Sequence, residues 1–366
     1  MNRFPVQYHR SQPGANRCPA APVIVATVTT TDRDGHETAP RLIDVARDAG
    51  VSTGTVSRVL NGEESVAADL RERVLAAVVR LGYRPNPYAR ALRTGSTNTV
   101  AVSVRTLRTL SVPDFLTGLT SVLAPHGYTV VVTETAMRPE VEQSSVLELQ
   151  LRRFHAVVAL NPHSLEPFVE CASVGVPALV VGAAAPPETP ILGMPLREGR
   201  AMRALAERLV ELRHQVVTQV IFGAEPETAI ARTPHVREGR LGLRSISLGA
   251  DGPSIWESLQ LPPVDELLAG DTTCLLLRPD VAAPVLAMLR RSDVRIPRDV
   301  SVVLRGQAAW TELHDPPLDA IELDFVEVGR QAGAHVLAML GADTEPDAMD
   351  FRYSYVPRDS VGAPLS

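Results

Sequence analysis

Residues 42–61 read LIDVARDAGVSTGTVSRVLN, and this stretch constrains the fold more than any other part of the chain. In its first half, apolar side chains recur one helical turn apart, at Leu42, Val45, Ala46 and Ala49. This spacing predicts an amphipathic helix with one buried stripe. Gly50 is placed to end that helix, because a residue without a Cβ turns easily there. Ser52 then has the chemistry of an N-cap for a second helix.

The second helix is predicted to have one apolar face and one small polar face. Val56, Val59 and Leu60 face inward. The other side carries short or polar residues, namely Thr53, Gly54, Ser57, Arg58 and Asn61. A face of this kind fits a DNA major groove. An ordinary solvated surface is the alternative, but it does not account for an arginine framed by small hydroxyl residues.

A third helix and a short following segment extend this unit. Leu70, Val74, Val78 and Leu81 form the third helical stripe, and Gly82 lies where a C-terminal glycine is expected. Further on, Asn86 and Pro87 are a good N-cap and first helical residue for a helix ending near Arg93. Because isolated helices below about 12 residues are marginal in water, we expect this one to become ordered on a partner.

The stretch from Leu42 to Thr99 closely resembles the DNA-binding headpiece and hinge of the lactose-repressor (LacI/GalR) family of bacterial transcription regulators. The matching segments, in order, are 44–46, 49–52, 55–61, 71–74, 81–83, 85–86 and 92–95. Weaker matches follow at 209–214, 296–303 and 315–318. Two positions depart from the family: Arg41 and Ala67 stand where Ser or Thr commonly caps a helix. Losing a cap costs on the order of 1 kcal/mol, so we expect a somewhat less stable headpiece.

The resemblance implies DNA-contacting roles for individual residues. Thr53, Gly54 and Arg58 occupy base-reading positions, with Arg58 the candidate for a bidentate contact to guanine. Leu92 resembles the leucine that wedges into the minor groove, and Ala89 would let two hinge helices approach. A buried core leucine is the alternative for Leu92. Phosphate contacts are implied for Ser52, Thr55, Ser57 and Asn61, and the predicted DNA-binding set is completed by Tyr83, Asn86 and Arg90.

Charge and cysteine content agree with a regulator of this type. The chain has a formal net charge of −6. Residues 41–95 nevertheless contain nine Arg against six Asp plus Glu, a local surplus of three positive charges. Three widely spaced cysteines without a CxxC or Cys/His pattern indicate reduced thiols in the cytoplasm. No metal or cofactor is predicted, and no apolar run approaches the length of a membrane span.

Residues 1–40 precede the headpiece and have one brief apolar patch, Val23–Val28, which is too short for the core of a signal peptide. We expect a disordered extension or a start codon assigned too early. The predicted domains are this extension (1–40), a helix-turn-helix headpiece (41–84), a hinge helix (85–97) and an α/β core (98–366).

From Thr99 onward, short β-rich runs alternate with helical stripes, which predicts βαβ units and parallel sheets covered by helices. Expected strands are 100–104, 128–133, 156–160, 178–181, 216–222, 245–248, 274–277, 301–304 and 320–323, and expected helices include 141–152, 201–213, 281–291 and 326–340. The resemblance implies two similar α/β lobes, as in periplasmic sugar-binding proteins, with chain crossings near Leu196, Leu318 and Asp347. An effector is then expected in the cleft between the lobes, at the carboxyl ends of the strands.

The cleft loops are where the sequence departs most from the family. The run 105–112 lacks the aromatic stacking platform, and the carboxylates and Asn that hold sugar hydroxyls are largely missing. Four loop arginines could instead converge on a carboxylate or phosphate. Alternatively they are solvated surface and the pocket is vestigial. The tentative effector set is Arg105, Arg197, Arg278, Asp280, Arg305 and Gln307, and a common neutral sugar is not the expected ligand.

The predicted function is a sequence-specific DNA-binding regulator, a repressor acting as a homodimer on a pseudo-palindromic operator. A single headpiece buries too little surface for specific affinity. The tail Pro357–Ser366 has no leucine heptad, so a dimer rather than a tetramer is expected. The alternative is a small-molecule-binding protein of the same fold without a regulatory role. No catalytic residues are predicted, because the histidines are scattered, at His126, His155, His163 and His214 among others.

Overall fold

The computed structural model describes residues 40–60, 66–83, 98–135, 138–151, 154–222, 228–248, 261–306, 310–347 and 349–365. The predicted extension lies outside these ranges except for Pro40, and the predicted hinge, 85–97, lies wholly outside them. Both therefore remain predictions. None of the helices in the described ranges is long and apolar enough to cross a bilayer. Within the same ranges, no group of three or more His, Cys, Asp and Glu side chains could hold a metal ion.

Three short helices form the N-terminal unit: α1 (Leu42–Ala49), α2 (Thr53–Leu60) and α3 (Ala68–Leu81). Val45, Val56 and Val74, one from each helix, are completely buried at its centre. Gly50 has φ +62°, the left-handed conformation that ends α1 and turns the chain toward α2. The predicted helix-turn-helix and third helix are therefore present.

The two unusual residues noted above leave helices α1 and α3 without a side-chain cap at their N-termini. Arg41 has no side-chain acceptor for the free N–H groups of α1, but its own backbone N–H donates to the Asp44 carboxylate at 2.8 Å. Ala67 provides no side-chain cap for α3. The C-terminus of α1 is held differently: Arg73 Nη2 of α3 donates to the Ala49 carbonyl oxygen at 2.6 Å. This bond satisfies a carbonyl that the end of a helix leaves open.

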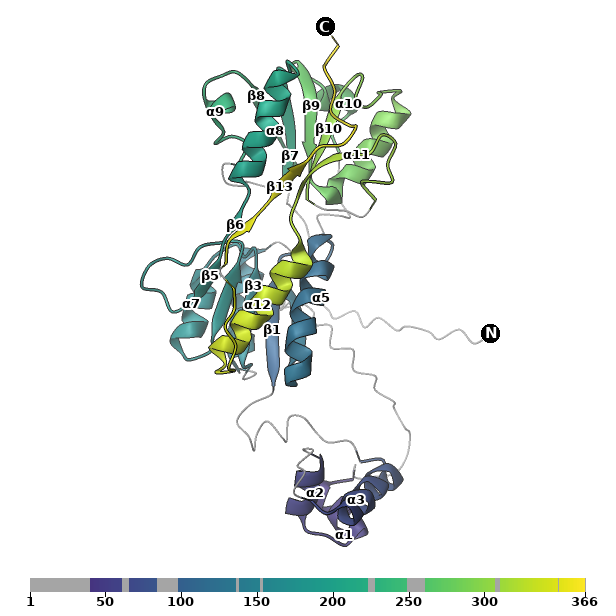
Figure 1. Cartoon of the computed structure of the whole chain (residues 1–366), viewed down its shortest axis with the longest axis vertical. Helices are drawn as coiled ribbons and strands as arrows, with labels where there is room; N and C mark the ends of the chain where they lie inside the picture. The colour runs from purple at the N-terminus through teal and green to yellow at the C-terminus, as the bar shows by residue number, and fades with distance from the viewer. Residues whose placement is uncertain are drawn as a thin grey trace, which may run out of the picture.

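The first lobe contains a five-stranded parallel sheet with the order β2-β1-β3-β4-β5. Its strands are β1 (Thr99–Val104), β2 (Thr129–Glu134), β3 (Ala156–Leu160), β4 (Ala178–Val181) and β5 (Leu192–Met194). The central strands are unbroken apolar runs because helices cover both faces. These helices are α5 (Ser111–Leu123), α6 (Pro139–Leu151), α7 (Glu166–Ser173) and α12 (Phe325–Met339), with the 3-10 turn η1 (Ala124–His126) after α5. Figure 1 shows α12, from late in the chain, lying beside α5.

The second lobe contains a six-stranded sheet with the order β13-β11-β10-β9-β7-β8, in which only β13 runs antiparallel to its neighbour. Its strands are β7 (Val216–Phe222), β8 (Gly242–Leu248), β9 (Thr272–Leu277), β10 (Ser301–Arg305), β11 (Asp319–Glu322) and β13 (Ser354–Val356). The helices are α8 (Gly199–Glu211), α9 (Pro234–Arg237), α10 (Val264–Leu267) and α11 (Pro279–Arg291). Cys171 in the first lobe and Cys274 in the second are buried free cysteines.

The chain passes between the lobes three times. The first and third crossings pair as a small parallel sheet of β6 (Leu196–Arg197) and β12 (Phe351–Arg352). The second crossing lies between β11 and α12. The prediction of a crossing at Leu196 is confirmed, whereas those at Leu318 and Asp347 are several residues early. Leu318 is fully buried in the second lobe, and β11 begins at the next residue. The chain crosses to the first lobe only after this strand ends.

Candidate DNA-binding face and interlobe cavity

The start of α2 is organised by a hydroxyl pair. The Ser52 side-chain oxygen accepts the Thr55 backbone N–H at 3.1 Å, which makes Ser52 the N-cap of the helix. The two hydroxyl oxygens lie 2.9 Å apart. Their positions are thus fixed at the tip of the helix-turn-helix before any partner binds.

Three residues on the outer side of α2 form the candidate base-reading face. Thr53, Gly54 and Arg58 are exposed to solvent. The Arg58 Nε lies 3.4 Å from the Gly54 carbonyl oxygen one turn earlier, so the guanidinium lies back along the helix. Because Gly54 has no side chain, the backbone beside Arg58 is open to close approach by a base edge. Arg58 offers the planar donor fork that can bind guanine at two points.

Ser57 does not lie on this outer face, and its predicted placement there is wrong. Its side chain is only 8% exposed, on the same side as Val56. The buried face of this short helix is therefore wider than the apolar pattern indicates. Tyr83 is half-buried and packs against the headpiece core, so its role in DNA binding remains a prediction. The other predicted DNA contacts, Asn61, Asn86, Ala89, Arg90 and Leu92, lie outside the described residues.

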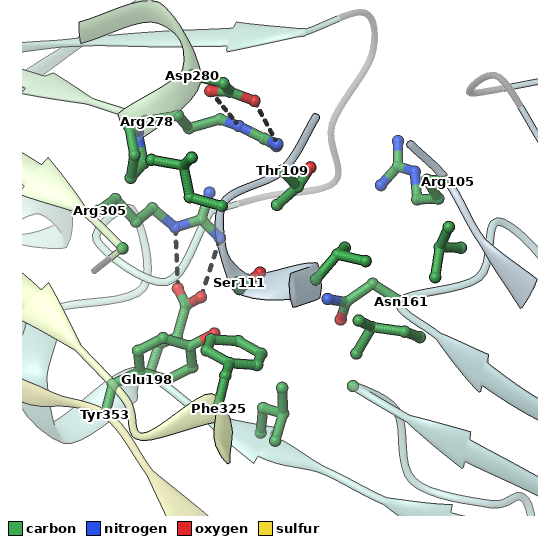
Figure 2. A pocket seen from close by; sticks show the side chains of 18 of the residues that line it. Arg105, Thr109, Ser111, Asn161, Glu198, Arg278, Asp280, Arg305, Phe325 and Tyr353 are labelled. Atoms are coloured by element: carbon green, nitrogen blue, oxygen red, sulfur yellow. Dashed lines mark hydrogen bonds and ion pairs between the residues drawn. The ribbon is translucent and has the colours of Figure 1, made fainter. Parts of the chain in front are cut away.

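A cavity of about 480 Å³ lies between the two α/β lobes, at the carboxyl ends of their strands. The first lobe contributes the loops after β1 and β3, and the second lobe contributes those after β9 and β10. The crossing segments form the side where the lobes join. Figure 2 shows Arg105, Arg278, Asp280 and Arg305 around this space. Four of the tentative effector residues are therefore brought together.

Two of these arginines are paired with carboxylates in the cavity wall. Arg305 binds Glu198 through two hydrogen bonds of 3.1 and 3.2 Å, although the residues are 107 positions apart (Figure 2). Arg278 binds Asp280 at 3.3 and 3.1 Å. The Asp280 side chain is 5% exposed and the Glu198 side chain 17%. These pairs place two fixed guanidinium forks in a site of reduced solvent access, where charge-assisted bonds are strong.

The wall formed by the first lobe is mostly uncharged and polar. Thr109, Ser111 and Asn161 lie along it, with Arg105 as its cationic group (Figure 2). Behind this wall, the buried Glu142 of α6 accepts the backbone N–H groups of His163 and Ser164 at 3.1 Å. Burial raises the pKa of Glu142, although those N–H groups and the Arg105 charge oppose the shift. The Glu142 carboxylate thus fixes the loop that carries Asn161.

Arg197 does not line the cavity, so the structure does not bring it together there with the other three loop arginines. Its predicted part in effector binding stays a prediction. It lies in β6 between Leu196 and Glu198, both of which line the cavity. Successive side chains of a strand point to opposite sides, so Arg197 points away. Its Nε lies 3.4 Å from an Asp350 oxygen, and its side chain is 63% exposed. Gln307 lies outside the described residues.

The cavity also has aromatic residues that the sequence pattern did not reveal. Phe325, at the start of α12, and Tyr353, after β12, pack edge to face with ring centroids 6.3 Å apart. Both line the cavity, as Figure 2 shows. The predicted lack of aromatic side chains is therefore correct only for the run 105–112. Phe325 is 5% exposed, so this pair supports the cavity more than it offers an open stacking face.

Several other cavity residues were missed, and some left a signal in the sequence. Asn161 follows a buried strand and Glu198 opens the helix after the first crossing, two positions where ligand groups gather in open α/β sheets. Thr228 and Arg232 lie in an irregular segment without such a pattern. Only the folded chain shows that they reach the cavity.

Two protein-family profiles match parts of the chain. Residues 41–86 match the profile of bacterial regulatory proteins of the lacI family. Residues 201–361 match that of the periplasmic binding protein-like domain. The chain therefore carries a lacI-type DNA-binding domain followed by a periplasmic binding protein-like domain. It is a transcriptional regulator with a DNA-binding helix-turn-helix, as the sequence predicted.

Two curated transcriptional regulators match nearly the whole chain. The HTH-type transcriptional regulator CelR of Thermobifida fusca is 28% identical over 338 residues, 88% of this chain and 98% of CelR. The HTH-type transcriptional regulator GntR of Pseudomonas aeruginosa is 27% identical over 364 residues, 92% of this chain and 100% of GntR. These relatives are transcriptional regulators and not enzymes.

Solved lacI-type structures share the fold. A LacI-family transcriptional regulator from Silicibacter pomeroyi superposes with a TM-score of 0.71 at 22% identity, covering 88% of this chain and 99% of that one. The lac repressor dimer bound to operator and the anti-inducer ONPF superposes with a TM-score of 0.67 at 24% identity, with the same coverage. The predicted fold class, a helical headpiece followed by a two-lobed α/β core with parallel sheets, is confirmed.

Proposed function

We propose that this lacI-family chain is a repressor that binds a pseudo-palindromic DNA operator as a homodimer. The observation that carries the proposal is the exposed face of α2, where Arg58 lies beside Gly54. The N-terminus of this helix is fixed by the Ser52 cap. Two such faces are needed because one headpiece buries too little surface for specific affinity. The lac repressor neighbour was solved as a dimer on its operator, which supports this arrangement.

The proposed domain division follows the function. Residues 41–84 read the DNA, 85–97 act as the hinge helix with Leu92 and Ala89 in the minor groove, and 98–366 bind effector and dimerise. The strand β1 is the first element of the core after the hinge sequence: it begins at Thr99, two positions after residue 97, and ends at Val104 in the cavity wall. Six residues of strand span about 20 Å. Movement of the first lobe on effector binding thereby reaches the hinge directly.

We propose an atypical effector for the cavity. Two ion-paired guanidinium forks and Arg105 suit a ligand that carries a carboxylate or phosphate better than a common neutral sugar. A vestigial cavity is the competing interpretation. The solved CelR neighbour is a complex with cellobiose, so cellobiose and glucose are the neutral ligands to titrate. Saturable micromolar binding of either sugar would contradict this proposal.

The regulator acts through binding rather than catalysis, in the cytoplasm where chromosomal DNA lies. The test of the function is selection of bound duplexes from a random pool by the full-length protein at low ionic strength. We expect enrichment of an inverted repeat whose two halves lie on one side of the duplex. If no duplex is retained, the proposal is wrong. Enrichment of an isolated half-site would contradict the homodimer.

A further inference from the structure

The surface beside the crossing strands has a hollow of about 680 Å³ whose charged side chains are mainly guanidinium groups. We call it the arginine hollow, after its residues Arg197, Arg200, Arg203, Arg232 and Arg352. The carboxylates of Glu198 and Asp350 also line it. Counted over the described part of the chain, the lining of the hollow has a formal surplus of three positive charges, while the whole chain has a net charge of −6.

Both carboxylates of the arginine hollow are already engaged. Asp350 accepts from Arg352 Nε at 2.9 Å and lies 3.4 Å from Arg197 Nε. The hydrogen bond from Arg352 lowers the pKa of Asp350, which is therefore a charged partner for both arginines. Glu198 is held from the cavity side by Arg305.

Arg200 and Arg203 lie in the first two turns of α8 and line the hollow, and both are exposed. Among the residues that the structure describes, no carboxylate forms an ion pair with either one. The hollow therefore presents positive charge that its own acidic groups do not offset.

The arginine hollow and the interlobe cavity are neighbours that share part of their lining. Leu196, Glu198 and Arg232 line both spaces, so the hollow lies directly beside the cavity. Among the residues that the structure describes, the linings of the two spaces hold eight arginines and three carboxylates, a formal difference of five positive charges. Charge of one sign gathered around a cleft raises the local concentration of an oppositely charged ligand.

We propose that the arginine hollow is an anion-binding subsite that holds phosphate or carboxylate groups of the effector, while the rest of that effector lies in the cavity. The planar guanidinium fork matches both oxyanions. A single exposed ion pair contributes little, so the ligand is a small molecule with several anionic charges that engages several arginines at once. Thr109, Ser111 and Asn161 offer hydrogen bonds to its uncharged part. This inference rests on the proposed role of the cavity as the effector site.

The test is calorimetric titration of the full-length protein, without DNA and at constant ionic strength, with inorganic pyrophosphate and, separately, with citrate. We expect saturable binding of at least one anion. In the double variant Arg200→Gln/Arg203→Gln its Kd should rise at least tenfold. The matched control is Arg290→Gln/Arg291→Gln, which removes two exposed neighbouring arginines from the last turn of the second-lobe helix α11. This variant should leave the Kd unchanged.

The outcomes separate the ligand chemistry from the proposed function. Binding of pyrophosphate alone identifies phosphate as the recognised group, and binding of citrate alone identifies carboxylate. Absence of saturable binding by both anions, or equal weakening in the two double variants, overturns the inference. The titration contains no DNA, so its result does not depend on duplex binding. If the protein selects duplexes but binds neither anion, only this inference is wrong. If the protein binds anions but retains no duplex, only the proposed function is wrong.

Discussion

Gly118 of α5 packs directly against the backbone of α12 at Val326, so closely that a Cβ at Gly118 would lie 1.9 Å from the Val326 carbonyl oxygen. The contact is reciprocal, since a Cβ at Gly329 of α12 would lie 2.1 Å from the Phe115 carbonyl oxygen of α5. Val326 follows Phe325, which lines the interlobe cavity. The close approach of these helices therefore fixes the first lobe against the second crossing segment.

Gly118→Ala should destabilise the α/β core by about 1–3 kcal/mol, because the new methyl group meets rigid backbone and the helices must separate. The measurement is the midpoint of chemical unfolding. Gly199→Ala is the matched control: Gly199 lies in the first turn of α8 with nothing within 4 Å of the added Cβ. That variant should be neutral or slightly stabilising. Equal stability of the Gly118 variant and the wild type would show that α5 and α12 are not packed in this way.

Arg58→Ala should remove sequence preference while leaving weak binding that depends on salt concentration. Loss of a bidentate base contact costs about 1–3 kcal/mol, or roughly a five- to 150-fold rise in Kd for the preferred site. Binding to unrelated duplexes should change little, because phosphate contacts supply it. The measurement is a titration of the selected duplex against a scrambled one. Arg237→Ala, which removes one exposed arginine from α9 of the second lobe, should retain the preference.

The sequence predicted the buried strands and the helices around them closely. β3, β4 and β7 have the expected bounds, since a run of β-branched and aliphatic residues that is buried on both faces is a strong local signal. In contrast, β6 and β12 are two residues each and pair across 155 positions, Leu196 with Phe351, so no local pattern marks them. The pairing of these short strands also decides the direction of Arg197, so the sequence pattern alone could not show that Arg197 lies outside the cavity lining.

The candidate site was also predictable in part, where its residues stand next to strands that the sequence marks. Arg278 and Asp280 follow β9 and Arg305 ends β10, and the rule that ligand groups gather at the carboxyl ends of parallel strands locates them. The partnership of Arg305 with Glu198, and of Phe325 with Tyr353, depends on how the crossing segments meet. Sequence alone could not show that two of the cavity arginines already have carboxylate partners.

His214 should make the core less stable in mild acid. It is 3% exposed, and its Nε2–H donates to the Gly362 carbonyl oxygen at 2.9 Å. Burial lowers the pKa of His214 in spite of hydrogen bonds with the Gly362 and Thr273 backbone. The unfolded chain therefore binds more protons than the folded one below about pH 6.5, and stability falls as the pH drops through that value. Unfolding midpoints between pH 5 and 8 are the measurement.

His214→Gln should reduce this loss of stability between pH 7 and pH 5, whatever its effect at neutral pH. Burial lowers the pKa of His155, His163 and His335 as well, so part of the slope should remain. His126→Gln, at an exposed site in η1, is the control and should keep the wild-type slope. An unchanged slope in the His214 variant would mean that the folded protein accommodates the charged ring.

Glu142 should have the opposite pH dependence. Burial raises its pKa above 4.5, so the folded chain holds the proton more tightly than the unfolded chain. Its contribution to stability is then largest below pH 4.5 and declines as the pH rises through the folded pKa. Glu142→Gln should remove this decline, and the difference in unfolding free energy between variant and wild type should shift in favour of the variant with rising pH. Glu170→Gln, at an exposed site in α7, should show a constant difference. Because the Glu142 carboxylate holds the loop beside Asn161, a variant that gains stability at high pH but loses effector affinity would show that the buried acid is kept to shape the cavity wall.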